Sequence, residues 1–298
     1  MGKFTDAIMG LVVGDAVGVP FEFRKRDTFT ADDMTGYGTY GLPAGTWSDD
    51  SSMTLATVDS IAEHGKINPE AIMRNFWLWY YHEHFTPFGE VFDVGGTTRQ
   101  AIHRYATGFP VSACGGKTDR DNGNGALMRI LPLAFYPGSL ADVITVASLT
   151  HNHRISNTAC ALYVAIARFL CTGMDAKRAI LEGFEKISRA IAIPDELIRI
   201  PYLFYKKRHE IKSTGYVVDT LEAALWCVAK STSYRECVLL AVNLGEDTDT
   251  VAAVAGGLAG ILYGIGGKKG IPEEWIAQIA KKEEIVALCE RFENKIMA

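Results

Sequence analysis

The sequence predicts an all-α fold, a single multi-helical bundle organised around one apolar, glycine-rich helix. Three observations lead to this prediction. Through most of the 298 residues, apolar side chains recur three and four positions apart, which is the period of an α-helix. Short stretches of helix-breaking residues separate these segments. Residues 251–267 carry no charge and place glycines at 256, 260 and 264, so neighbouring helices can approach them closely.

The first helix is expected over residues 5–17, where Ile8, Leu11 and Val12 share a face and Gly18-Val19-Pro20 ends the pattern. Residues 24–46 are polar and lack any period, which is typical of a loop that can cover a site. Further helices are expected over residues 51–62, 68–84, 100–107, from 126, 139–149, 157–171, 176–191, 197–212, 219–230, 234–244, 249–267 and from 272 to the end of the chain.

Composition narrows the class of protein. A net charge of −5 offers no basic face for nucleic acid. The six cysteines form no CxxC pair and lie mostly in apolar helical patterns, which indicates reduced thiols and a cytoplasmic location. Charges at Lys3, Asp6 and Asp15 argue against a signal peptide. The uncharged residues 250–267 would just span a bilayer, but the acids at their start favour a buried helix, so we expect no membrane partner.

Two acids stand at the start of the central apolar helix. Gly245 can end the preceding helix, and Asp247 and Asp249 follow it directly. Residues two apart point to opposite sides of a helix, so we place both acids in the turn before the apolar run, where the helix dipole also favours carboxylates. Together with the Thr250 hydroxyl they form a crowd of oxygen ligands of the kind that a hard divalent cation prefers.

The same chemistry occurs about 200 residues earlier, where Ser48, Asp49 and Asp50 precede another helix. Adjacent carboxylates repel each other unless hydrogen bonds or a cation compensate them. Each motif alone is more typical of an N-cap than of a metal site. Two matching motifs could instead share a pair of metal ions. They can do so only if both halves fold together, and no linker divides the chain, so we expect one domain over residues 1–298 and a monomer.

Four blocks of the sequence, in order, resemble the ADP-ribosylglycohydrolase family, which includes the dinitrogenase reductase activating glycohydrolases. The blocks are residues 14–23 (GDAVGVPFEF), 47–53 (WSDDSSM), 122–129 (NGNGALMR) and 244–250 (LGEDTDT). The resemblance implies a compact, orthogonal all-helical bundle that uses two Mg²⁺ or Mn²⁺ ions to cleave ADP-ribose from a modified side chain. Serine at 48 and 51, where the family usually has threonine, and the bulky acid Glu246 depart from the common pattern.

On this resemblance the metal ligands would be Ser48, Asp49, Asp50, Asp247, Asp249 and Thr250. Asp93 opens a tight turn with Gly95, and Glu22 lies between two phenylalanines. Either acid, with Asp49, is a candidate for catalysis. The alternatives are an ordinary helix cap for Asp93 and an ion pair of Glu22 with Arg24 or Arg26.

The segment Asn122-Gly123-Asn124-Gly125 exposes backbone N–H groups and side-chain amides before an expected helix start, so it can bind the pyrophosphate, although a plain turn has the same composition. His151 lies in a polar connection that we place near the site. Hard oxygen ligands make an imidazole ligand unnecessary there, so we assign His151 to substrate binding instead of to the metal.

The expected activity is hydrolysis at C1 of the distal ribose, with arginine as the foremost acceptor among modified side chains and small ADP-ribose conjugates. The ions would align the ribose hydroxyls and polarise a water. Two other classes stay open. A di-metal phosphohydrolase would release AMP or phosphate, and a non-catalytic relative would bind ADP-ribose or serve structurally without cleaving the bond.

Overall fold

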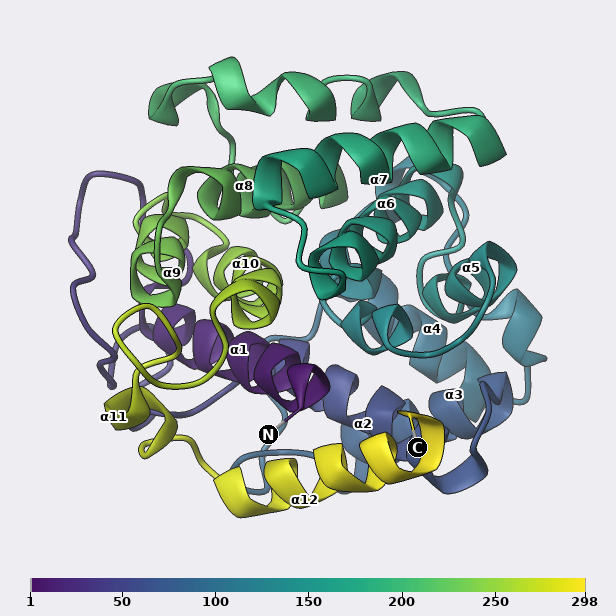
Figure 1. The fold of residues 1–298 in the computed structure, drawn as a ribbon. Coiled ribbons are helices and arrows are strands. Elements are labelled where there is room, and N and C mark those ends of the chain that lie inside the picture. Colours follow the sequence, from purple (N-terminus) through teal and green to yellow (C-terminus); the bar gives the residue numbers. More distant parts are fainter. Residues whose placement is uncertain (1, 298) are drawn as a thin grey trace.

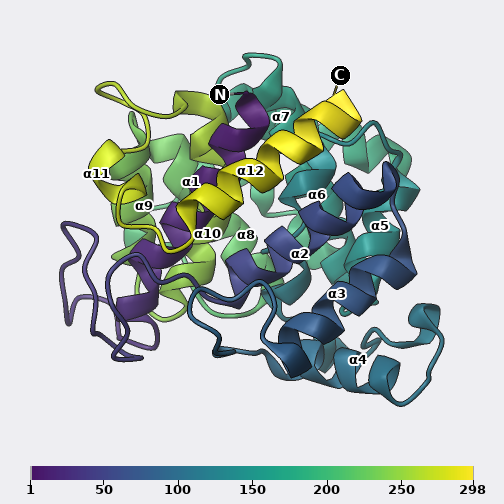
Figure 2. The same cartoon turned by 90° about the horizontal axis from the view of Figure 1, so that it is seen from below.

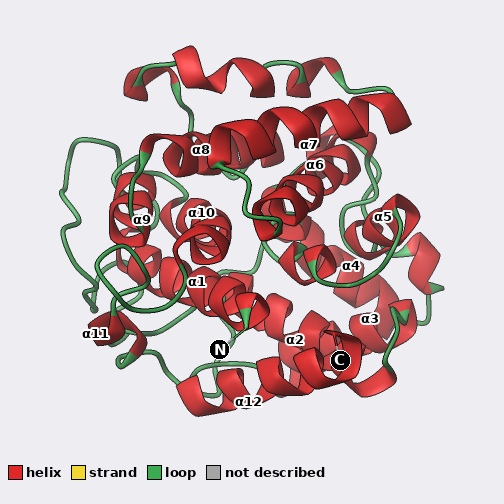
Figure 3. Ribbon diagram, in the orientation of Figure 1, coloured by secondary structure: helices red, strands yellow, loops and turns green. Residues whose placement is uncertain are grey.

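The computed structural model describes residues 2–297 and contains α-helices and short 3₁₀ and π turns with no β-strand in that range (Figure 3). Three isolated bridges, such as the one between Gly116 and His151, are the only sheet-like pairings within the described residues. The predicted all-α fold class is therefore confirmed.

Two helices from opposite ends of the sequence form the centre of the bundle. Helix α1 (Lys3–Gly18) packs along α10 (Thr248–Tyr263), and both are almost wholly buried (Figure 1). A Cβ atom on Gly10 would lie 2.5 Å from the carbonyl oxygen of Gly256, and one on Gly256 would lie 2.4 Å from that of Gly10. The two backbones therefore touch, as the glycine spacing in α10 predicted.

Residues Lys3–Phe21 are long and apolar enough to cross a membrane, but 94% of the 18-residue apolar window within them is buried inside the protein. The shorter apolar helix α10 is buried against it. Burial on all sides is what the interior helix of a large bundle requires.

The remaining helices surround this pair. Helices α8 and α9 pack on α10, while α6 packs on α5, α7 and α8; α12 lies across α1 and α2, and α2 also contacts α3 (Figures 1 and 2). Their bounds are α2 Asp49–His64, α3 Pro69–His82, α4 Gly96–Ala106, α5 Leu140–Ser148, α6 Arg154–Cys171, α7 Ala176–Ala190, α8 Val217–Lys230, α9 Tyr234–Val242, α11 Glu273–Ile276 and α12 Lys282–Phe292. Most lie within a few residues of the expected ranges.

The helix expected from residue 126 is wrong. The chain instead forms two 3₁₀ turns, Asn124–Ala126 and Leu131–Ala134. Pro132 explains the difference, because its ring would clash with the carbonyl of residue 128 in an α-helix and it has no N–H to donate.

The helix expected over residues 197–212 is also wrong, and three 3₁₀ segments replace it: Asp195–Leu197, Ile200–Tyr205 and Arg208–Glu210. The buried side chains Leu197, Ile200 and Leu203 are spaced by three residues. This spacing suits an α-helix as well as a helix with three residues per turn, and Pro201 breaks α-helical hydrogen bonding within the range, because it has no N–H and its ring would clash with the carbonyl of residue 197.

The C-terminal helix is interrupted where the sequence predicted one continuous element. After α11 the chain leaves the helix, Lys281 adopts a left-handed φ of 54°, and α12 begins at the next residue. The N–H of Ala280 donates to the carbonyl of Gly45, 3.1 Å away. This contact with a distant loop replaces helical hydrogen bonding, so the break has a tertiary cause.

The close approach of α1 and α10 continues to the point that positions the functional groups. A Cβ atom on Gly18 would lie 2.3 Å from the Cα of Asp249. The end of α1 therefore touches the start of α10, and the first turn of α2 lies beside both. Acids from three separate segments can meet there.

Candidate active site

A cavity of about 340 Å³ opens where these helix ends meet. Ten of the residues that the sequence predicted for the site line it: Glu22, Asp49, Asp93, Gly95, Gly123, Asn124, Gly125, His151, Asp247 and Thr250. Ser48, Asp50 and Asp249 are buried around the same helix starts without lining the cavity. Asn122 lies apart, and its side chain makes other contacts.

Asp15 is a residue of the site that the sequence reasoning did not assign. From α1 its carboxylate accepts hydrogen bonds from the N–H of Ser48 at 3.0 Å, and from the N–H and hydroxyl of Ser51 at 3.1 and 2.5 Å. Burial raises the pKa of Asp15 to about 7, against the hydrogen bonds that lower it. Asp15 thus fixes the first turn of α2 against α1. An acid inside an apolar helix was the signal that could have identified it.

The carboxylates form two groups that share Asp249. Oxygens of Asp15, Asp50 and Asp249 lie within 4.8 Å of one another, as do those of Glu22, Asp93 and Asp249. Burial, followed by the charge of neighbouring carboxylates, raises the pKa of Asp50 and of Asp249 well above the ordinary range. The acids of the two sequence motifs therefore do meet in space, and they repel one another unless something compensates them.

Several of these buried oxygens have no hydrogen-bond partner within the described residues. They are both oxygens of Asp50, Oδ1 of Asp247 and Oδ2 of Asp249. Buried polar atoms are nearly always paired, and an unpaired carboxylate oxygen is costly. Both Asp15 oxygens, in contrast, accept hydrogen bonds from Ser48 or Ser51 at the start of α2. The donors left free are oxygen atoms alone, the ligands that hard divalent cations prefer, so Asp50, Asp247 and Asp249 are each available to bind such a cation.

The two helix starts differ in their capping. The Ser48 hydroxyl accepts a hydrogen bond from the N–H of Asp50 at 3.3 Å and is a true N-cap. Asp247 occupies the N-cap position of α10 but its side chain caps nothing. The capping interpretation therefore accounts for Ser48 and leaves the carboxylate of Asp247 available.

Glu22 and Asp93 lie on the other side of the acid cluster. The Tyr40 hydroxyl donates to Glu22 Oε2 at 2.5 Å. Burial and then the charge of Asp93 raise the pKa of Glu22 to about 9. The alternative ion pair is not found among the described residues, because Arg24 lies over aromatic rings and Arg26 donates to backbone carbonyls. Glu22 is therefore a buried acid that faces the cavity.

The rim near these acids has an unusual backbone. Phe23, Asp93 and Glu246 all have left-handed φ angles, between 58° and 65°. The N–H of Phe23 donates to the carbonyl of Glu246 at 2.7 Å, and the N–H of Glu246 donates to that of Arg24 at 2.8 Å. Strain of this kind persists only where the surroundings enforce it. The Glu246 side chain is exposed, so it adds no charge to the buried cluster.

The glycine-rich segment lies at the cavity and also supports an acid of the site. The amide of Asn124 donates to Asp247 Oδ2 at 2.8 Å and to the Thr220 hydroxyl at 3.0 Å. It therefore orients an acid, while Gly123 and Gly125 form the cavity wall. The Asn122 side chain instead accepts from the Ser156 hydroxyl at 2.9 Å.

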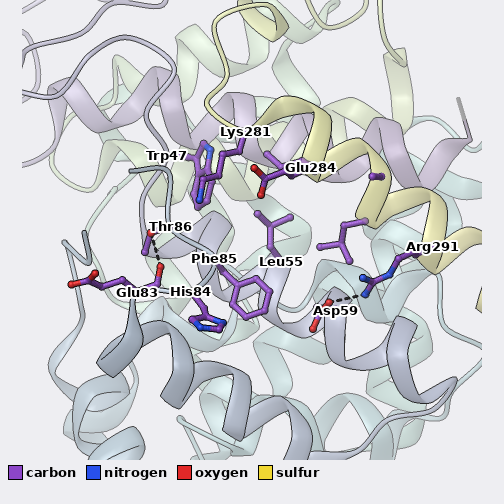
Figure 4. A pocket seen from close by; sticks show the side chains of 13 residues that line it. Trp47, Leu55, Asp59, Glu83, His84, Phe85, Thr86, Lys281, Glu284 and Arg291 are labelled. Atoms are coloured by element: carbon purple, nitrogen blue, oxygen red, sulfur yellow. Dashed lines mark hydrogen bonds and ion pairs between the residues drawn. The ribbon is translucent and has the colours of Figure 1, made fainter. Parts of the chain in front are cut away.

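A second cavity, of about 510 Å³, lies between α2, the turn after α3 and α12 (Figure 4). Its wall includes Leu55, Phe85 and Ile285, and its acid Asp59 is paired with Arg291 at 2.7 Å. None of the unpaired carboxylate oxygens lies there. The smaller cavity, and not this one, carries the reactive groups.

These features define an all-helical protein whose site gathers buried, unpaired carboxylates from separate helix starts, as a metal-dependent hydrolase would. Comparison with known proteins gives the family. The family model for ADP-ribosylglycohydrolase matches residues 1–298, and the chain belongs to that family. It is thus a hydrolase of glycosyl bonds that releases ADP-ribose from a modified side chain.

Individual relatives agree with this assignment. The chain is 35% identical over 294 residues to the ADP-ribosylarginine hydrolase Tri1 of Pseudomonas putida (strain GB-1), covering 96% of this chain and 76% of that protein. It is 32% identical to the ADP-ribosyl-[dinitrogen reductase] glycohydrolase of Rhodospirillum rubrum, covering 93% and 90%. A solved structure described as an ADP-ribosylglycohydrolase-related protein complex superposes with a TM-score of 0.84 at 32% identity, over 99% of this chain and 98% of that one.

Proposed function

We propose that this protein hydrolyses the bond between ADP-ribose and an arginine side chain with the help of two divalent cations, Mg²⁺ or Mn²⁺. The unpaired oxygens of Asp50, Asp247 and Asp249 are the single observation that carries the proposal. An acid-lined cavity also suits a cationic guanidinium better than a neutral acceptor. Two relatives of this chain are named as ADP-ribosylarginine hydrolases.

Asp49, Asp50, Asp247, Asp249 and Thr250 would hold the cations. Bound there, the ions supply Lewis acidity toward the ribose hydroxyls and an attacking water. The cluster of carboxylates additionally favours the positive charge that develops on the sugar ring as the glycosidic bond breaks. Asn124 keeps Asp247 in place through its hydrogen bond to Oδ2.

The two acids on the opposite side of the cavity divide the proton transfers. Glu22 has its pKa raised to about 9, so it holds a proton at neutral pH and can donate it to the leaving group. Asp93 lies within 4.8 Å of it, and hydrogen bonds from its neighbours oppose the rise in its pKa that burial causes. Asp93 is therefore the better base for the attacking water.

The wall formed by Gly123, Gly125 and His151 would receive the pyrophosphate. Both glycines line the cavity, and the absence of a side chain on Gly125 lets its backbone lie against His151, since a Cβ there would lie 2.9 Å from His151 Cε1. The overall negative charge does not attract an anion, so local donors must bind it.

The test is incubation with ADP-ribosyl-arginine and ADP-ribosyl-serine peptides in Mg²⁺, Mn²⁺ or EDTA, using the native protein, Asp49→Asn and Asp247→Asn. The exposed acid Asp195 provides the matched control, Asp195→Asn. We expect ADP-ribose release from the arginine peptide that needs both the metal and the two acids. Release of AMP would indicate a phosphohydrolase. Tight binding without turnover would indicate a non-catalytic relative, and faster release from the serine peptide would indicate serine as the acceptor.

We further propose a monomeric protein of the cytoplasm. All six cysteines are free thiols, and five of them are buried, which suits a reducing compartment.

A further inference from the structure

Behind the cavity wall lies a fully buried arginine, Arg129, that has no carboxylate partner among the described residues. Arg129 is 0% exposed, and its Nη1 and Nη2 donate to the Val146 carbonyl at 3.1 Å and to the Thr150 hydroxyl at 2.7 Å. Its guanidinium carbon lies 4.7 Å from the centre of the Phe76 ring. Burial lowers the pKa of Arg129 to about 10, so it remains a cation. Burying a cation without a counter-charge is costly, and the hydrogen bonds to Val146 and Thr150 offset part of that cost.

Arg129 determines the orientation of the Thr150 hydroxyl. Thr150 is also 0% exposed, and its oxygen lies 2.9 Å from His151 Nδ1. Because Arg129 already donates to that oxygen, the hydroxyl proton needs an acceptor, and Nδ1 is its one acceptor within residues 2–297. Nδ1 therefore carries no proton, and the proton of the neutral imidazole resides on Nε2.

The Nε2 atom of His151 lies on the side of the ring that faces the glycines of the cavity wall. His151 lines the cavity beside Gly123 and Gly125, and a Cβ on Gly123 would lie 3.5 Å from Nε2. Nε2 has no hydrogen-bond partner in the described part of the chain. Burial, then the charge of Arg129, lower the pKa of His151 to about 3, against the opposing charge of Asp121. The ring thus stays neutral.

We propose that Arg129 and Thr150 are positioning residues that lock His151 as an Nε2–H donor toward an acceptor oxygen of the ADP-ribosyl group. In the other tautomer a lone pair on Nε2 would face that oxygen and repel it. The identity of the ligand rests on the proposed function. The tautomer itself follows from the Arg129–Thr150–His151 chain alone.

The tautomer is measured by two-bond ¹H–¹⁵N NMR of protein labelled in its histidines, without ligand, with His151→Gln used to assign the signal. We expect the Nε2–H form in the native protein and in Thr150→Ser, which keeps the hydroxyl. Thr150→Val removes it and should populate the Nδ1–H form. Finding Nδ1–H in the native protein, or no change in Thr150→Val, would overturn the lock, and the native measurement needs no variant to fold.

Binding of ADP-ribose by calorimetry tests the consequence. We expect the Kd of Thr150→Ser to stay within about 2-fold of native and that of Thr150→Val to rise about 10-fold, the loss of one well-placed hydrogen bond. The buried hydroxyl of Thr158, away from the cavity, gives the matched control Thr158→Val, which should change neither readout. An unchanged Kd in Thr150→Val would overturn the positioning role. The Nε2–H tautomer without any binding of ADP-ribose would support the lock and contradict the proposed function.

Discussion

Replacing Asp249 by asparagine should stabilise the metal-free protein although the residue is buried in its core. Asp249 belongs to both groups of carboxylates, it is 0% exposed, and its Oδ2 has no partner among the described residues. Asparagine keeps an oxygen for the N–H of Thr250, which Oδ1 accepts at 2.9 Å. Its amide also offers a donor to the neighbouring carboxylates. The substitution therefore removes repulsion and adds a hydrogen bond.

The expected size follows from the geometry. Two unit charges 4.8 Å apart, the outer limit of each group, interact by about 3.5 kcal/mol at an effective dielectric constant of about 20. Protons shared among the raised-pKa acids already relieve part of this energy, which leaves about 1–3 kcal/mol. For a chain of this length that corresponds to a rise in Tm of about 2–5 °C.

Thermal unfolding in EDTA and in MnCl₂ measures the effect of the substitution and the effect of the metal on stability. The native protein should gain about 2.7 kcal/mol when the metal is present at about 100 times its Kd. Asp249→Asn should have a higher Tm than the native protein in EDTA and should lose most of the stabilisation by Mn²⁺. Asp195→Asn should behave like the native protein. A lower Tm of Asp249→Asn in EDTA, or an undiminished response to Mn²⁺, would refute the reasoning.

Three further outcomes follow from the packing and the charges. In EDTA, Tm should rise as the pH falls from 9 to 7, because the pKa of Glu22 is raised to about 9 and folding takes up its proton. The free energy of unfolding should increase by about 1.4 kcal/mol for each pH unit. A flat or falling Tm would contradict this. Gly14→Ala, whose Cβ would lie 2.2 Å from the Ala252 carbonyl oxygen, should cost about 1–3 kcal/mol in urea unfolding, whereas Gly96→Ala meets open space and should cost nothing. Arg26→Ala, which loses three hydrogen bonds to backbone carbonyls, should cost about 2–4 kcal/mol, and a loss below 1 kcal/mol would contradict that role.

Local sequence was sufficient to locate the acids, because each pair stands where a polar turn meets a long apolar helix. The contact between the two motifs was beyond local sequence. It depends on Gly10, Gly14 and Gly18, which bring α1 against α10, and on Asp15, which ties α2 to α1. A single acid in an apolar helix gives no indication of which distant N–H groups it will accept from.

The errors in secondary structure have local causes that the apolar period concealed. A spacing of three, as at Leu197, Ile200 and Leu203, fits both an α-helix and a 3₁₀ helix, and only the backbone hydrogen bonds between residues three apart show which is present. Pro132 was a visible signal against a helix from residue 126. The break before α12 depends on a hydrogen bond between Ala280 and Gly45, which no local pattern encodes.

The most direct test of the central claim is a crystal structure of the native protein soaked in Mn²⁺, with anomalous diffraction recorded at the manganese edge. We predict strong peaks bonded to the oxygens of Asp50, Asp247 and Asp249. An acid cavity without any peak at saturating Mn²⁺, or peaks confined to other sites such as the cavity beside α12, would contradict the assignment of these carboxylates to a catalytic metal.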